Sequence, residues 1–155
     1  MRTAILGVGN LLLKDEGIGV HVAQACARLS LPEEVEVIDG GTSIELAHLV
    51  EGFDKMIVID AASAGGKPGQ IYHFTLEEIE QNESPLLSGH EFGIARTLSA
   101  SALGGKSPRT VLVIGVEPKE IDWGLELSPE LENKIPEIVK HVLREIEPGG
   151  GDARK

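Results

Sequence analysis

Short apolar runs are spaced along the chain, with helical patterns between them. Four mostly apolar runs have strand length: Thr3–Val8, Val35–Ile38, which Glu36 interrupts, Met56–Ile59 and Val111–Gly115. Such runs are typical of parallel strands that helices bury on both faces. A fifth run, Gln70–Phe74, directly follows a short glycine-rich loop. This direct connection predicts an antiparallel edge strand.

Amphipathic patterns predict helices between and after these strands. They cover Gly17–Leu29, Ser43–Val50, Phe92–Leu103 and Pro129–Ile146. Pro136 should kink or split the last helix, because proline lacks the amide hydrogen that a helix interior uses. The order of elements predicts a three-layer α/β/α sandwich around a mostly parallel, five-stranded twisted sheet with one antiparallel edge strand. We expect one domain over residues 1–147 and a disordered tail at 148–155, where proline and glycines follow one another.

Composition narrows the class of protein. The 155 residues are 41% hydrophobic but only 3% aromatic, so one core built from aliphatic side chains is expected. The formal net charge of −11 argues against nucleic acid or an anionic membrane as the main partner. No apolar stretch is long enough to cross a membrane, and we read no targeting segment. The single cysteine, Cys26, should be a small buried hydrophobe, and we expect a cytoplasmic monomer.

The first strand runs into a glycine turn, Gly7-Val8-Gly9-Asn10, which resembles a nucleotide-binding loop. The third glycine of that pattern is missing, and Asp15 and Glu16 precede the helix. Carboxylates at this point repel a pyrophosphate, which is bound by free amide groups and a positive helix end. Nucleotide binding therefore remains only a weaker alternative.

Acidic residues follow the core strands. Glu16 comes after the first strand, Asp39 ends the second, Asp60 follows the third, and Glu117 follows the fourth parallel strand. Carboxyl ends of parallel strands meet at one sheet edge, so these acids could face one crevice, where a cation or proton must offset their repulsion. His90 could add an imidazole, giving a site for a divalent transition metal with open positions. Asp39 and Asp60 could equally be cap and turn residues, and spacing alone does not decide.

Other polar and aromatic residues have simpler interpretations. We expect Asp15 to be a structural partner of the helix dipole rather than a catalyst. Structural and substrate-contacting roles are equally open for Glu117. Trp123 lies in a predicted loop and could either pack beneath the last helix or contact the substrate, and packing is favoured. His73 and His141 should be solvated.

Six short motifs follow one another along nearly the whole chain. They are Gly7, Gly9, Asn10, Leu12, Asp15, Glu16 and Gly19 around the opening turn; Asp39–Thr42; Asp60-Ala61; His90; Gly115–Pro118; and Leu127-Ser128-Pro129. In this order and spacing the chain resembles the nickel-iron hydrogenase maturation endopeptidases. The resemblance implies a compact α/β/α enzyme that acts on the hydrogenase large subunit precursor. It would remove a short C-terminal extension after nickel has been inserted.

The resemblance also implies a site. Glu16, Asp60 and His90 would be the metal-interacting and catalytic residues, and the nickel would arrive with the precursor, with no organic cofactor. Asp39 is a further catalytic candidate. The adjoining Gly40, Gly41 and Thr42 would help place the peptide, since glycines let another backbone approach closely. Whether the metal is catalytic or only recognised stays open, and water is the default nucleophile.

Three alternatives remain at this stage. The same residues would serve a nickel-sensing chaperone that does not cleave its partner. A nucleotide-binding α/β module is the second alternative. The third is a related peptidase with another substrate, such as a spore protein.

Overall fold

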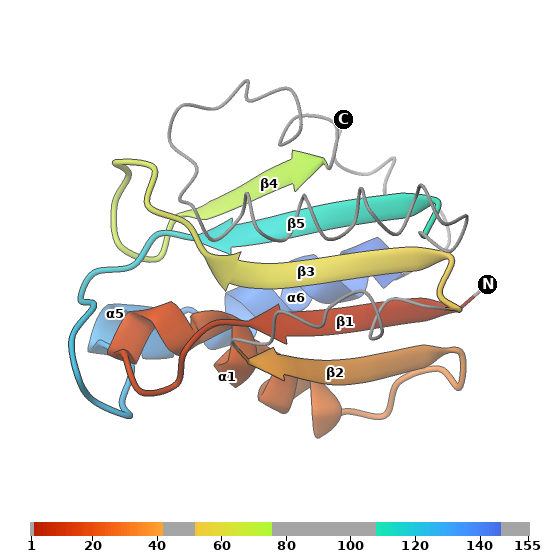
Figure 1. Ribbon diagram of the computed structural model, residues 1–155, viewed down its shortest axis with the longest axis horizontal. Coiled ribbons are helices and arrows are strands. Elements are labelled where there is room, and N and C mark those ends of the chain that lie inside the picture. Colours follow the sequence, from red (N-terminus) through yellow and green to blue (C-terminus); the bar gives the residue numbers. More distant parts are fainter. Residues whose placement is uncertain (1, 42–51, 76–107, 147–155) are drawn as a thin grey trace.

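The computed structural model describes residues 2–41, 52–75 and 108–146 (Figure 1). Its elements are β1 (Thr3–Val8), the 3-10 helix η1 (Lys14–Gly17), α1 (Ile18–Ala27), β2 (Val35–Gly41), β3 (Lys55–Ala61), β4 (Ile71–Thr75), β5 (Thr110–Val116), α5 (Pro129–Glu132) and α6 (Ile135–Ile146). The strands form a five-stranded sheet in the order β2-β1-β3-β5-β4. The predicted α/β class is confirmed.

The sheet is parallel except at one edge. β1 pairs in parallel with β2 and β3, and β3 with β5, whereas β4 runs antiparallel to β5. The predicted antiparallel edge strand is therefore confirmed. Several strands extend beyond their apolar runs, and β3 continues to Ala61, so Asp60 lies inside a strand rather than after it. Four strands thus present their carboxyl ends at one edge of the sheet (Figure 1).

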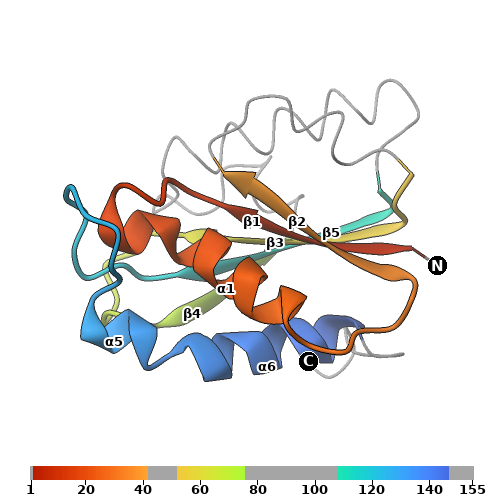
Figure 2. The same cartoon turned by 90° about the horizontal axis from the view of Figure 1, so that it is seen from below.

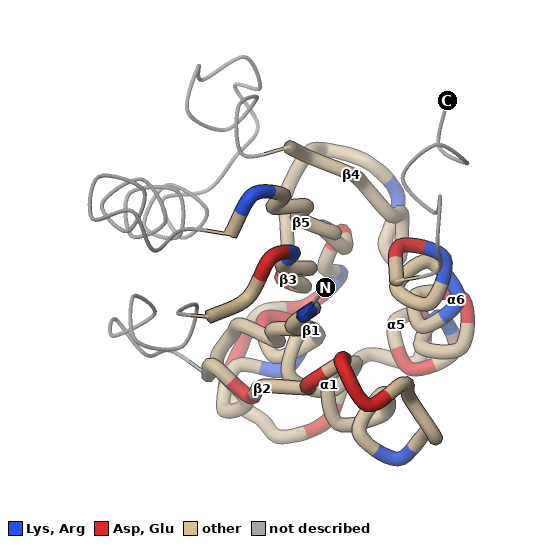
Figure 3. Tube along the Cα trace, turned by 90° about the vertical axis from the view of Figure 1, so that its right-hand side faces the viewer, with Lys and Arg blue, Asp and Glu red and all other residues tan. Residues whose placement is uncertain are grey.

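Helices α1, α5 and α6 all cover one face of the sheet (Figures 2 and 3). The buried apolar side chains form two clusters. One, beneath these helices, includes Ile5, Ile57, Ile114, Ile138 and Val142, and the other includes Ala4, Leu6, Met56, Val58 and Val113. Because side chains alternate along a strand, the clusters lie on opposite faces of the sheet. The core is aliphatic, as the composition predicts.

Some expectations fall outside the described residues. These are the predicted helices Ser43–Val50 and Phe92–Leu103 and the tail at 148–155. Among the described residues, no helix combines the length and hydropathy that crossing a membrane requires.

The C-terminal helical segment is split in two, as the proline predicts. α5 ends at Glu132, and α6 begins at Ile135, so Pro136 is the second residue of α6. A proline in the first turn costs little, because the amide groups there have no partner within the helix. One histidine expectation was wrong. His73 Nε2 and His141 Nδ1 lie 2.9 Å apart, so the two rings join β4 to α6 rather than being solvated separately.

Glycines let α1 pack directly on the ends of the central strands. A Cβ atom on Gly19 would overlap the carbonyl oxygens of Val8 and Ile59. Gly9 has a φ of 143°, and a Cβ there would overlap the carbonyl oxygen of Glu16. No side chain therefore separates the start of the helix from the carboxyl ends of β1 and β3.

Candidate active site

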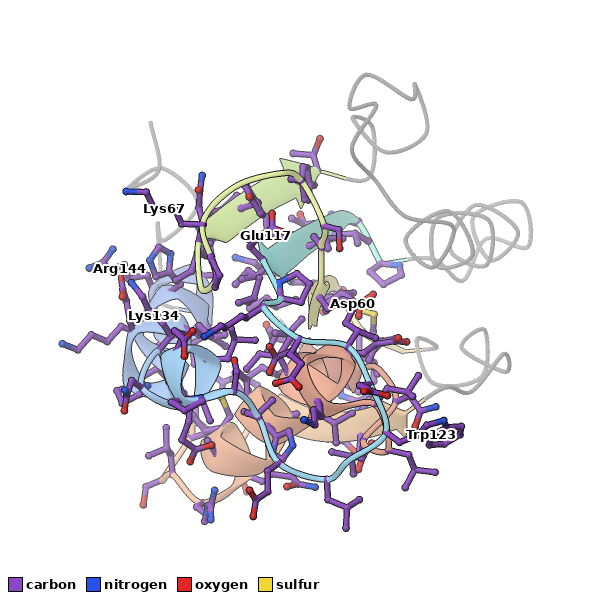
Figure 4. All side chains as sticks on the ribbon, turned by 90° about the vertical axis from the view of Figure 1, so that its left-hand side faces the viewer. Asp60, Lys67, Glu117, Trp123, Lys134 and Arg144 are labelled. Atoms are coloured by element: carbon purple, nitrogen blue, oxygen red, sulfur yellow. The ribbon has the colours of Figure 1, made fainter. Side chains whose placement is uncertain are left out.

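Asp60 lies at the carboxyl edge of the sheet, near the middle of the view in Figure 4. It is the penultimate residue of β3, and its side chain is completely buried. Its Oδ1 accepts a hydrogen bond of 2.8 Å from the Ala61 amide. A buried carboxylate at the ends of parallel strands occupies the place where open α/β folds usually build their sites.

Glu16 is brought to the same edge by backbone packing. It lies in η1 and is half-buried. The close approach of Gly9 fixes the Glu16 backbone, and three residues later Gly19 contacts Ile59, the residue before Asp60. The structure therefore places Glu16 and Asp60 at one end of the sheet, as the strand-end pattern predicts.

The third predicted metal-interacting residue, His90, lies outside the described residues, as does Thr42. Within residues 2–41, 52–75 and 108–146, no three His, Cys, Asp or Glu side chains gather in a way that could hold a metal ion. A set of Glu16, Asp60 and His90 thus stays a prediction.

Asp39 lies at the carboxyl end of β2 and is exposed. It pairs with Gly7, which pairs in turn with Ile59. Asp39, Gly7 and Ile59 are therefore neighbours across the three strands, and the side chains of Asp39 and Ile59 share one face of the sheet. Because side chains alternate along a strand, the side chain of Asp60 lies on the opposite face. The register then shifts, because Val8 pairs with Gly41 and leaves Gly40 as an extra residue. The roles of Asp39 and of the two glycines stay predictions.

Asp15 is a structural anchor rather than a site residue. It is fully buried, and its carboxylate accepts hydrogen bonds from the amides of Lys119 (2.9 Å), Glu120 (2.8 Å) and Ser128 (2.7 Å). The Ser128 hydroxyl donates a fourth bond of 2.8 Å. Asp15 is structural, as expected, but it bonds the segment that leads into α5 rather than acting on the dipole at the start of α1. That segment is thereby held beside Glu16.

Glu117 also has a structural position. Its Oε1 accepts hydrogen bonds from the amides of Ala64 (2.8 Å) and Gly66 (3.0 Å) and from the Tyr72 hydroxyl (2.7 Å). It therefore fastens the glycine-rich loop to the edge strand. Burial first, and then the bond to Glu117, raise the pKa of Tyr72.

The expectation that Trp123 packs beneath the last helix was wrong. Its side chain is 75% exposed and points outward at the periphery in Figure 4. Leu127 and Leu131, which follow it in the chain, are buried instead. The sequence around Trp123 contains no pattern that distinguishes a buried indole ring from an exposed one.

Fold and site together define a small α/β enzyme with acidic side chains at the carboxyl edge of its sheet. The chain belongs to the hydrogenase maturation protease family, whose model matches residues 20–145. Among curated relatives, the hydrogenase 2 maturation protease of Escherichia coli K12 is 35% identical over 99% of this chain and 95% of its own. The hydrogenase expression/formation protein HupD of Bradyrhizobium diazoefficiens is 34% identical, over 86% of this chain and 72% of its own.

Solved structures agree. The hydrogenase maturating endopeptidase HybD from E. coli superposes with a TM-score of 0.84 at 34% identity, covering 94% of this chain and 92% of its own. HybD from Thermococcus kodakarensis, a [NiFe] hydrogenase maturation protease, gives a TM-score of 0.79 at 31% identity, over 95% and 100% of the two chains. The chain is thus a hydrolase of the hydrogenase maturation class. These findings favour the endopeptidase over the non-cleaving chaperone and the nucleotide-binding module.

Proposed function

We propose that this endopeptidase removes the C-terminal extension of the nickel-loaded large subunit precursor of a [NiFe] hydrogenase. The observation that carries the proposal is the placement of Glu16 and the buried Asp60 at one sheet edge in a chain of this family. We further infer that the enzyme works as a monomer in the cytoplasm. Its only cysteine, Cys26, is a buried free thiol, which agrees with a reducing compartment.

In this proposal, nickel is part of the substrate. Two carboxylates and an imidazole, from Glu16, Asp60 and His90, form a mixed oxygen and nitrogen donor set that suits Ni²⁺ and leaves positions for ligands from the precursor. The bound ion would supply a Lewis acid that can polarise a carbonyl or activate water. The protein would hold these three side chains at the edge of the sheet. The backbone contacts of Gly9 and Gly19 fix the position of Glu16 among them.

The loop that follows β2 would place the peptide. Asp39, Gly40 and Gly41 end an outer strand beside β1, and Thr42 follows them in the chain. Glycines there leave room for a second backbone. The scissile segment would then lie along the same edge as Glu16.

The decisive experiment measures cleavage of a nickel-loaded precursor by intact mass. We expect Glu16→Gln, Asp60→Asn and His90→Ala each to lower the rate at least about 100-fold, because each removes a ligand of the ion. Glu34→Gln is the matched control: an exposed acid that precedes β2, at the amino end of the sheet. It should cleave at the wild-type rate.

Full processing by all three variants would refute the site. Equal cleavage of nickel-free and nickel-loaded precursor by the wild type would refute recognition of the ion. A precursor whose mass never changes would refute the peptidase assignment.

A further inference from the structure

Two neighbouring loops expose large apolar side chains. We call Leu12, Ile121, Trp123 and Leu125 the Trp123 patch; their exposed fractions are 52%, 50%, 75% and 66%. The only other large apolar side chain exposed in the described part of the chain is Leu29. Backbone hydrogen bonds join the two loops, since the Gly124 amide donates to Leu12 (2.8 Å) and the Lys14 amide donates to Gly124 (3.0 Å). The loops that carry these exposed apolar side chains therefore lie side by side, and exposed apolar patches mark interaction sites.

The patch is held in place before any partner arrives. Asp15 bonds the amides of Lys119 and Glu120 at one end of the longer loop and Ser128 at the other. The Asp15 amide also donates to the Glu120 carbonyl oxygen (3.1 Å). A surface that is already ordered loses little conformational entropy on binding, which favours affinity.

The patch adjoins the proposed site along the chain. The backbone between Leu12 and Glu16 is short, and the Asp15 side chain fixes the longer loop beside it. Figure 4 looks onto this edge and shows Trp123 at its periphery, while Asp60 lies nearer the middle. A substrate held at Glu16 and Asp60 would therefore be within reach of the patch.

The charges around the patch indicate the chemistry of its partner. Two acids, Asp122 and Glu126, lie among the apolar residues of the segment Ile121–Glu126. Asp122 and Glu126 are exposed, and neither takes part in an ion pair within the described ranges, although Asp122 is close enough to attract Lys14 electrostatically. The neighbouring bases are already used, because Lys14 pairs with Glu120 (2.7 Å) and Lys119 with Glu130. The surface is thus apolar with an unneutralised negative charge, which complements a basic and apolar segment.

We propose that the Trp123 patch docks an apolar, basic segment of the large subunit precursor, outside the nickel site, and so contributes to the selection of the substrate. This inference rests on the proposed function. The patch binds rather than reacts, so its loss should raise KM and leave kcat unchanged. A tryptophan that becomes buried in an interface commonly supplies much of the binding free energy. Removing the Trp123 side chain should therefore raise KM at least about tenfold.

The kinetic test compares the double variant Trp123→Ser/Leu125→Ser with Leu29→Ser, which removes an exposed apolar side chain outside the patch, beyond the end of α1. The first variant should show the raised KM with wild-type kcat, and the second should match the wild type. Asp122→Lys should also raise KM, and the increase should shrink as salt is added. An unchanged KM in both patch variants would overturn the proposal.

The contact itself can be read without any cleavage. Trp123 is the only tryptophan, so labelling with 5-fluorotryptophan gives one fluorine resonance. Adding nickel-loaded precursor to the labelled Glu16→Gln enzyme should shift that resonance. A resonance that stays in place, or one that shifts with enzyme concentration alone because two copies associate, would overturn the proposal. A wild-type enzyme that fails to cleave the precursor would instead refute the proposed function.

Discussion

Replacing Asp15 by alanine should destabilise the protein strongly, because one carboxylate satisfies four donors. Two of the donors, the amide and hydroxyl of Ser128, are buried, and the residue is only 4% exposed. The other two belong to the exposed residues Lys119 and Glu120, whose amides can bind water instead. The cost should therefore come mainly from the Ser128 end of the anchor.

The magnitude follows from these two buried donors. A hydrogen bond to a charged group contributes about 1.5–3 kcal/mol, so losing both should lower the free energy of unfolding by about 3–6 kcal/mol. Small proteins have about 5–15 kcal/mol in total, so the variant would be near its limit of stability. Ser128→Ala removes one donor and leaves the carboxylate bonded to three amides. It should cost only about 1.5 kcal/mol.

The assay is urea unfolding followed by far-ultraviolet circular dichroism, with Asp15→Asn as a third variant. The asparagine side chain keeps the shape of aspartate but turns an NH₂ group toward hydrogen-bond donors. Its loss of unfolding free energy should therefore lie between those of Ser128→Ala and Asp15→Ala. Equal free energies of unfolding for the wild type and Asp15→Ala, within about 0.5 kcal/mol, would refute the anchoring role.

Further predictions concern single titratable groups. Burial lowers the pKa of His21 below its usual 6.5, so the neutral form is favoured in the native state; stability should fall as pH drops below 6.5, and His21→Gln should flatten that slope in unfolding measurements. Glu117→Gln should lower the pKa of Tyr72, the only tyrosine, and absorbance titration would show no change if their hydrogen bond were absent. Burial raises the pKa of Cys26 from 9.0 to about 11, so its reaction with a disulfide reagent at pH 8 should be at least about 100-fold slower than that of free cysteine; a rate equal to that of free cysteine would contradict its burial.

Strands were predicted well because their signal is local. β1, β3 and β5 are built on aliphatic runs, β2 on a run that only Glu36 interrupts, and the direct loop before β4 identified the antiparallel edge. The predicted ends of the strands were less accurate. Asp39 and Asp60 still pair with neighbouring strands, although both lie beyond the apolar runs. Hydrogen bonding in the ladder, not hydropathy, decides where a strand stops.

The site was predictable as a place but not as a set of contacts. The strand-end acids indicated the sheet edge at which Glu16 and Asp60 lie, yet similar aspartates turned out to have different surroundings. Asp15 is bonded across the fold to Ser128, over a hundred residues away, whereas Asp60 bonds its neighbour Ala61. Long-range partners of this kind depend on loop paths that no local pattern encodes. The exposure of Trp123 was missed for the same reason.

The backbone contacts at Gly9 and Gly19 have an evolutionary consequence. Because main chain meets main chain there, the spacing between the helix start and the strand ends does not depend on the size of any side chain. Substitutions that repack the aliphatic core can accumulate without changing that spacing. Sequence drift in the interior is thereby uncoupled from the geometry of the carboxyl edge of the sheet, so long as these two glycines are retained.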